Sequence, residues 1–217
     1  MKLLLTSAGY EKNPIIGKEF LKLLNKNPSK IKVFLVTTAK RKEKDWKWVK
    51  FTLKQLEKLG ILSVNVSIFS LNRRIKKEDL RDKDVIYVCG GNTFVYLDRI
   101  KKTGLDKKIK EFVQKDKIYF GVSAGSIIMG LNIEPAGWKH ADKNIINLKD
   151  LTGLKLVPFV IAPHIDKTNI KATKKCANKA DYPIVALSDK QAVLVKGKIR
   201  RIVGTGDKLI FNTTNRF

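Results

Sequence analysis

The chain contains little cysteine and histidine and no long apolar run. These shortages exclude several classes of protein. Two cysteines and two histidines among 217 residues provide neither a disulfide framework nor the spacing of a metal site. No segment has the ~20 apolar residues of a membrane span, or the charged start and apolar stretch of a signal peptide. We therefore expect a cytoplasmic protein with reduced thiols, without a metal, another cofactor or a membrane partner.

No linker, low-complexity tract or internal repeat divides the sequence. The apolar share of 43% is sufficient for a sizeable core. We therefore expect residues 1–217 to form a single α/β domain, and a homodimer stays open.

Acidic residues are scarce beside basic ones, 20 against 45, and the formal net charge is +25. Such a charge would suit an anionic partner such as nucleic acid. The excess is mostly lysine, however, whereas arginine has the planar fork that phosphates and bases favour. The positive residues are also dispersed, without interleaved aromatic residues on which bases could stack. We interpret them as a solvated surface, with nucleic acid not expected as a partner and a polyanion-binding protein as the alternative.

What the chain does contain is an alternation of apolar strands and amphipathic helices. Predicted strands cover 2–6, 31–36, 64–69, 84–89, 117–122 and 157–162. Predicted helices cover 15–24, 45–59, 93–100, 105–114 and 167–179, with another beginning at 123–130. The tail, with runs at 184–187, 191–195, 198–203 and 208–211, is typical of short antiparallel strands, with a hairpin turn at Lys196-Gly197. In the helix at 45–59 we interpret Trp46 and Trp48 as packing residues. This order predicts a three-layer α/β sandwich with a mostly parallel central sheet and a small antiparallel C-terminal hairpin region.

A possible nucleophile follows the strand at 117–122. The sequence Gly121-Val122-Ser123-Ala124-Gly125 is G-x-S-x-G between a strand and a helix, the context that makes this motif meaningful. A sharp turn there would expose the Ser123 hydroxyl above the sheet, and the Ala124 amide could donate to an oxyanion. The alternative is an ordinary helix N-cap.

A serine nucleophile needs a base and a carboxylate that orients it. His164 follows the strand at 157–162 and would lie at the same sheet edge as Ser123. The other histidine, His140, lies in an irregular polar stretch and suits this role less. Asp189 follows the run at 184–187 and is the first candidate for the carboxylate that orients the histidine. The alternatives are Glu134, Asp142 and Asp166, the last of which suits capping of a helix.

Gly90-Gly91-Asn92-Thr93 follows the strand at 84–89 and precedes a helix. Two glycines allow close approach of the backbone to a ligand. We expect the Gly91 amide to join Ala124 in an oxyanion hole, and Gly90 and Asn92 to contact the substrate. The alternative is a tight turn capped by Asn92 or Thr93.

Together, Gly90 to Phe94, Gly121 to Ser126, Pro163-His164 and Leu187 to Ala192 resemble the dipeptidase E (aspartyl dipeptidase) family of serine peptidases, with cyanophycinase as a more distant relative. The resemblance spans essentially the whole chain. It implies a class I glutamine amidotransferase-like fold with serine in place of cysteine, and a Ser–His–acid triad. Ser123, His164 and Asp189 fall on the matching positions, and Glu134 is the alternative for the acid of the triad.

The resemblance implies a serine peptidase that hydrolyses dipeptides or other short peptides through an acyl-enzyme. Aspartyl dipeptidases are expected to hold an acidic N-terminal residue with an arginine beyond the histidine. Residues 167–180 contain Lys171, Lys174 and Lys175 but no arginine, and lysine lacks the bidentate fork. Strict Asp-X specificity is therefore not expected, and an esterase or amidase on the same scaffold is the alternative.

Overall fold

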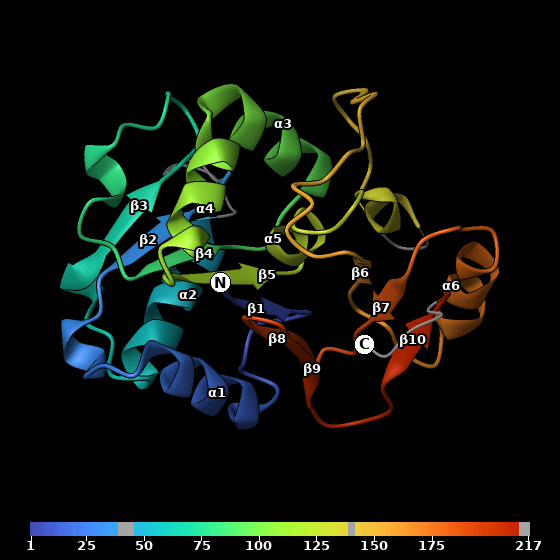
Figure 1. Ribbon diagram of the computed structural model, residues 1–217, viewed down its shortest axis with the longest axis horizontal. Coiled ribbons are helices and arrows are strands. Elements are labelled where there is room, and N and C mark those ends of the chain that lie inside the picture. Colours follow the sequence, from blue (N-terminus) through green and yellow to red (C-terminus); the bar gives the residue numbers. More distant parts are fainter. Residues whose placement is uncertain (39–45, 139–141, 213–217) are drawn as a thin grey trace.

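The computed structural model describes residues 1–38, 46–138 and 142–212, which form a mixed α/β fold (Figure 1). Within this part of the chain the larger sheet has seven strands, in the spatial order β3 (Val66–Phe69), β2 (Val33–Val36), β4 (Val85–Val88), β5 (Ile118–Val122), β1 (Lys2–Thr6), β8 (Gln191–Lys196) and β9 (Ile199–Gly204). The five strands from β3 to β1 run parallel, and β8 is antiparallel to both its neighbours. The prediction of a mostly parallel central sheet is confirmed.

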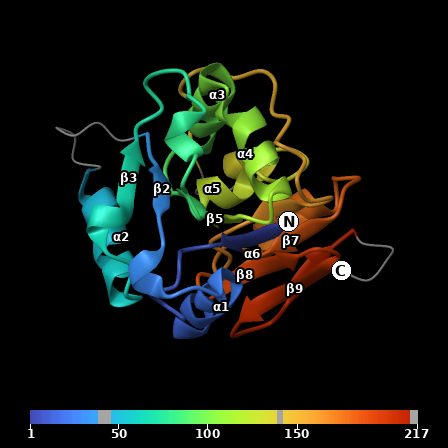
Figure 2. The same ribbon diagram turned by 60° about the vertical axis from the view of Figure 1, so that its left-hand side comes forward.

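The inner strands are mostly apolar because helices cover both faces of the sheet. In β1 the side chains alternate, so that Leu3 and Leu5 join one buried cluster and Leu4 joins the other. Helices α3 (Thr93–Thr103), α4 (Leu105–Gln114) and α5 (Ala124–Ile127) pack on the first face, and α1 (Pro14–Leu24) and α2 (Trp46–Lys58) on the second (Figure 2). The result is the predicted three-layer sandwich. Four single 3₁₀ turns in this part of the chain lie at Pro28–Lys30, Ser63–Asn65, Glu78–Leu80 and Glu134–Gly137.

Local signals in the sequence mark where several helices begin and end. Asn13 caps α1 by accepting a hydrogen bond from the Ile15 amide, and Asn92 caps α3 through the Val95 amide. Gly104 ends α3 with a left-handed backbone, φ +76°. Helix α6 (Ile170–Ala177) is shorter than predicted. Its first predicted turn is instead a loop in which the Asp166 carboxylate accepts hydrogen bonds from the amides of residues 168 and 169.

A second sheet, in the order β10 (Leu209–Phe211), β7 (Ile184–Ala186) and β6 (Val160–Ala162), differs from the prediction. We expected the strand at 157–162 in the central sheet and only antiparallel pairing in the tail. Instead, β6 and β7 pair in parallel, and only β10 is antiparallel to β7. One face of these strands, with Ile161 and Val185, joins the main core, and the other packs on α6. The hairpin at Lys196-Gly197 forms as predicted, between β8 and β9.

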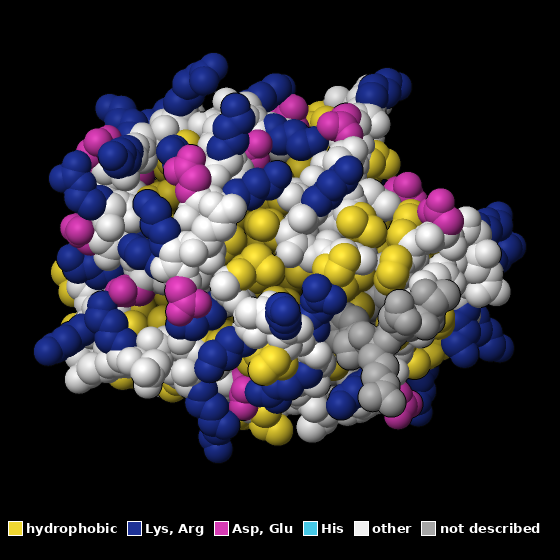
Figure 3. Space-filling model, in the orientation of Figure 1, with side chains coloured by type: hydrophobic (Ala, Val, Ile, Leu, Met, Phe, Trp, Pro, Cys, Tyr) yellow, Lys and Arg dark blue, Asp and Glu magenta, His cyan; other side chains and the backbone are white. Residues whose placement is uncertain are grey.

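Positive side chains on the surface are dispersed. On the face that Figure 3 shows, Lys and Arg side chains lie over many elements, with Asp and Glu between them, and form no continuous band. Ion pairs such as Lys26–Asp84 and Arg73–Asp79 use part of this charge locally. Within the described ranges, no helix has the length and apolar character needed to cross a membrane.

Candidate active site

Five strands of two different sheets position the groups that meet at the site. In the central sheet, β4, β5 and β1 are neighbours, and their carboxyl ends lead to Gly90, Ser123 and Ser7. In the second sheet, β6 leads to His164, and its parallel neighbour β7 leads into the turn that holds Asp189. Ser123 and His164 therefore come from different sheets, not from one edge as expected. The packing of the two sheets brings them together.

Ser123 occupies a strained turn between β5 and α5, with φ +50° and ψ −108°. A non-glycine residue with positive φ outside the usual left-handed region costs about 1–3 kcal/mol, and such strain is concentrated at functional sites. The Ser123 amide donates to the Thr6 carbonyl at 3.0 Å, and the Ser126 hydroxyl donates to backbone carbonyls of β1 and β5. These contacts hold the turn against the sheet, so that the Ser123 hydroxyl is fixed above the strand ends.

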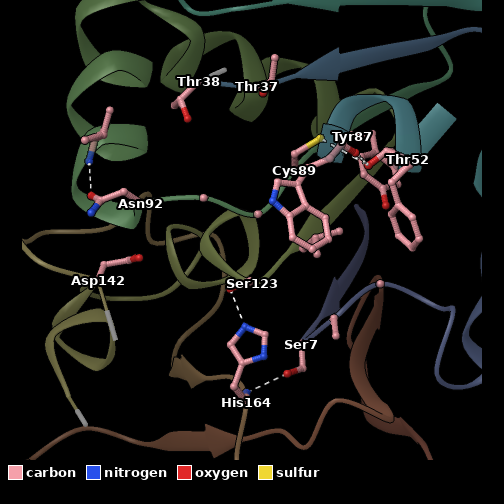
Figure 4. A pocket seen from close by; sticks show the side chains of 18 of the residues that line it. Ser7, Thr37, Thr38, Thr52, Tyr87, Cys89, Asn92, Ser123, Asp142 and His164 are labelled. Atoms are coloured by element: carbon pink, nitrogen blue, oxygen red, sulfur yellow. Dashed lines mark hydrogen bonds between the residues drawn. The ribbon is translucent and has the colours of Figure 1, made fainter. Parts of the chain in front are cut away.

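Ser123, His164 and Asp189 form a continuous chain of contacts (Figure 4 shows the first pair). Ser123 Oγ lies 2.8 Å from His164 Nε2, and His164 Nδ1 lies 2.6 Å from Asp189 Oδ1. The carboxylate favours the tautomer with the proton on Nδ1, and this leaves Nε2 able to accept the serine proton. The arrangement can therefore deprotonate a serine and stabilise the imidazolium that results.

Ser7 and Lys12 hold the carboxylate in place. The buried Ser7 hydroxyl donates to Asp189 Oδ1 at 3.0 Å and accepts a hydrogen bond from the His164 amide at 2.8 Å. Lys12 Nζ lies 2.5 Å from Asp189 Oδ2. The His164 hydrogen bond above all, followed by those of Lys12 and Ser7, holds the pKa of Asp189 well below its ordinary value. Asp189 therefore stays ionised at every pH at which the histidine could act as a base.

The backbone of His164 is fixed as well. Its φ is +60°, uncommon for a residue with a side chain. The Asn169 side chain donates a hydrogen bond to the His164 carbonyl at 2.7 Å, and the His164 amide donates one to the Ser7 hydroxyl. These two hydrogen bonds orient the imidazole toward Ser123.

The loop after β4 lies beside the serine. A Cβ placed on Gly90 would lie 3.6 Å from the Ser123 Cβ, so the two backbones are in contact. Gly91 has φ +152°, and a Cβ there would lie 2.9 Å from the Tyr96 ring, so this position requires glycine. Asn92 lines the same cavity, but its side chain caps α3 and donates to the Lys143 carbonyl. The capping alternative thus describes the Asn92 side chain, and the residue also borders the cavity.

The structure separates the alternative acids from the histidine. Glu134 accepts a hydrogen bond from the Tyr182 hydroxyl. Asp142 accepts hydrogen bonds from the amide and the hydroxyl of Thr93 at 2.6 Å each. Asp166 stabilises its own loop, as expected for a capping residue. His140 lies outside the described residues.

A cavity of about 1110 Å³ extends from Ser123 and His164 along the carboxyl ends of the strands toward α2. Trp48 lines it and is 56% exposed, so its interpretation as a packing residue is wrong. Trp46 does pack against the core. Lys171, Lys174 and Lys175 on α6 are exposed and lie outside the cavity lining. In the described part of the chain, no group of three His, Cys, Asp or Glu side chains is arranged to hold a metal ion.

Comparison with known proteins assigns the chain to a family. Residues 3–203 match the model of peptidase family S51. The uncharacterized peptidase Lmo0363 of Listeria monocytogenes is 34% identical over 172 residues, 76% of this chain and 82% of the relative. Peptidase E of Shewanella denitrificans is 28% identical over 164 residues, 70% of this chain and 68% of the relative.

Solved structures agree with this assignment. A crystal structure of a Listeria monocytogenes protein described as a Peptidase E candidate has a TM-score of 0.77 and 30% identity, covering 94% of this chain and 98% of that one. A peptidase from an acI-B1 actinobacterium shares the fold, with a TM-score of 0.68 and 18% identity over 99% of this chain and 92% of that one. The chain belongs to peptidase family S51, a family of serine peptidases.

Proposed function

We propose that this peptidase hydrolyses short peptides, dipeptides among them, through an acyl-enzyme formed on Ser123, with His164 as the base and Asp189 as the orienting acid. The observation that carries the proposal is the unbroken contact from Ser123 Oγ through the imidazole to the Asp189 carboxylate. The strained backbone of Ser123 and its position at the cavity wall support it further. The two unpaired cysteines, Cys89 and Cys176, suit a reducing compartment such as the cytoplasm.

In the proposed reaction, His164 Nε2 takes the proton of the Ser123 hydroxyl as Oγ attacks the carbonyl carbon of the peptide bond. The amides of Gly91 and Ala124 would stabilise the tetrahedral oxyanion. Within the described residues, neither amide has a hydrogen-bond acceptor of its own. The imidazolium then returns its proton to the leaving amine, and water, deprotonated by the same histidine, releases the acyl group.

The cavity also bears on the size and charge of the substrate. Its volume of about 1110 Å³ slightly exceeds the usual range for ligand pockets, about 300–1,000 Å³. This volume suits short peptides and does not restrict the enzyme to dipeptides. Because the lysines of α6 lie outside the lining, we expect no strict requirement for an acidic N-terminal residue.

Labelling with a fluorophosphonate tests the proposal directly. An activated serine displaces fluoride from the phosphorus of the probe and forms a stable phosphonate ester, which mass spectrometry locates in the sequence. We expect labelling at Ser123, loss of labelling in Ser123→Ala, and strong reduction in His164→Ala. Folded wild-type protein that remains unlabelled, or that is labelled equally after either substitution, would contradict the proposal.

Lys12 provides a prediction about activity. Its ammonium pairs with Asp189 Oδ2, while Asp189 Oδ1 contacts the imidazole. With Lys12→Met the carboxylate loses this partner and is held less firmly against His164, so kcat/KM should fall. Lys12 is 55% exposed, and exposed pairs are worth ~0.2–1 kcal/mol, which corresponds to a decrease of at most about fivefold. Steady-state kinetics with a peptide substrate would measure it.

Lys26→Met is the matched control for this change. Lys26 pairs with Asp84 at 2.9 Å, and both groups have exposures similar to those of Lys12 and Asp189. We expect its kcat/KM to match that of the wild type. An unchanged kcat/KM in Lys12→Met, or an equal decrease in both variants, would show that Lys12 does not support the triad.

A further inference from the structure

The active-site cavity exposes large apolar side chains. Trp48 and Phe51 on α2 line it, and we refer to this pair as the apolar wall. Ile145 and Ile146, from the loop that precedes Leu148, border the same cavity. Trp48, Ile145 and Ile146 are 56%, 69% and 40% exposed. Seven large hydrophobic side chains are this exposed among the described residues, and three of them border this cavity.

The sequence of α2 explains why the two aromatic residues face the cavity. The buried face of this helix is formed by Val49, Thr52, Gln55 and Leu56. Trp48 and Phe51, three residues apart, are neighbours on the adjoining face. Their rings meet edge to face, with centroids 6.1 Å apart and planes at 81°. The pair is thus preorganised, and its outer surface contacts solvent instead of the core.

Exposure of this kind has a free-energy cost that a ligand can remove. Transfer of apolar surface out of water contributes about 25 cal/mol per Å², and contiguous exposed apolar patches mark binding sites. The apolar wall shares its cavity with Ser123 and His164. A peptide attacked by Ser123 can therefore place one of its own side chains against this wall.

Among the described charged groups that line the cavity, all but the exposed Glu11 have partners. Lys12 pairs with Asp189, Asp142 accepts from Thr93, and Asp98 pairs with Lys102. Arg99 donates one hydrogen bond to the Thr38 carbonyl and retains further donors. An acidic substrate side chain would therefore depend on Arg99, whereas an apolar one would meet the apolar wall.

We infer that the apolar wall is a specificity subsite that binds a large apolar side chain of the peptide substrate, of the size of phenylalanine or leucine. The inference rests on the proposed function of Ser123 and adds the substrate class. Trp48 and Phe51 are its specificity-determining residues, and the peptides preferred by the enzyme have an aromatic or branched aliphatic residue within reach of them.

Two peptide series measure this preference: X-Ala and Ala-X, with X as Phe, Leu, Ala or Asp. In at least one series, kcat/KM for Phe and Leu should exceed that for Ala and Asp by about tenfold or more, as for contacts in a hydrophobic pocket. Trp48→Ala should remove about tenfold of the Phe advantage over Ala. Val64→Ala, at an 86% exposed residue outside the cavity lining, should leave that advantage unchanged.

Binding to the Ser123→Ala protein gives a readout without turnover. Phe-Ala or Ala-Phe should displace the tryptophan emission maximum to shorter wavelength, and the same peptide should fail to do so in Ser123→Ala/Trp48→Phe. An unchanged Phe preference in Trp48→Ala would overturn the inference. So would an Asp preference that Arg99→Gln abolishes.

Fluorophosphonate labelling tests the nucleophile Ser123 separately from the apolar subsite. Labelling of Ser123 at similar rates in the wild type and Trp48→Ala, without any apolar preference, would overturn the subsite alone. A wild-type protein that hydrolyses none of the peptides and is not labelled would overturn both the proposed function and the subsite.

Discussion

Replacement of Asp189 by asparagine is expected to lower kcat/KM by about 10⁴-fold, because the amide can donate a hydrogen bond to His164 Nδ1. Nδ1 then loses its proton, the proton moves to Nε2, and Nε2 no longer accepts from Ser123 Oγ 2.8 Å away. The substitution also removes the negative charge that stabilises the imidazolium. Steady-state kinetics with a peptide substrate would measure the loss, and circular dichroism would show that the fold is retained.

Glu134→Gln is the decisive control for this assignment. Both residues are acidic and both follow the nucleophile in the sequence, but the Glu134 carboxylate contacts Tyr182 and not the histidine. We expect Glu134→Gln to retain kcat/KM within about twofold, the range of surface substitutions away from special features. Near-normal activity of Asp189→Asn together with a large loss in Glu134→Gln would reverse the assignment of the acid.

The sequence was sufficient to place the candidate triad because each of its members follows a predicted strand. Ser123, His164 and Asp189 come after β5, β6 and β7, and the structure brings all three into contact. It was not sufficient to assign the strands to sheets. Apolar periodicity indicates that a segment is a strand, but strand pairing depends on contacts between segments far apart in the chain. For this reason the separate sheet of β6 and β7 was missed.

The residues that support the triad differ in how well the sequence could have found them. Ser7 follows β1, so the rule that identified Ser123 could have identified it as well. Lys12 is one cation among 45 basic residues, and nothing in its neighbours distinguishes it. Its role depends on the approach of Asp189, which is 177 residues further along the chain.

Trp48 is a case in which the pattern was more informative than the residue type. The helical spacing of Trp46, Val49, Leu53 and Leu56 places Trp48 off the apolar stripe of α2. Because tryptophan is usually buried, we interpreted it as a packing residue. Its exposure at the cavity follows from its position on the helix and indicates a role outside the core.

A Gly125→Ala substitution is expected to destabilise the fold by about 3 kcal/mol or more, the upper range for overpacking of a core. The added methyl group would lie 2.6 Å from the Val88 carbonyl oxygen and 2.9 Å from the Val88 Cβ. Both atoms belong to β4 in the centre of the sheet, where neither strand nor helix can move without loss of other contacts. For a chain of this size the change corresponds to a fall in Tm of about 6–12 °C, which calorimetry or thermal circular dichroism would measure.

Gly137→Ala is the matched control, because among the described residues a methyl group there would meet only the Phe94 ring, at 3.8 Å. We expect its Tm to remain within a few degrees of the wild type. If Gly125→Ala proves too unstable to purify, its soluble yield beside that of Gly137→Ala provides the comparison. Equal stability of the two variants would contradict the packing argument.

The same geometry explains why the motif needs glycine on both sides of Ser123. Neither Gly121 nor Gly125 has a positive φ; the positive φ belongs to Ser123 itself. A methyl group on Gly121 would lie 2.6 Å from the Gly125 carbonyl oxygen, so each glycine allows the close approach of α5 to the strands. Since that approach fixes the strained turn, Gly125→Ala should also slow fluorophosphonate labelling of Ser123 at temperatures where the variant is still folded. Labelling at the wild-type rate in folded Gly125→Ala would show that the glycine serves stability alone.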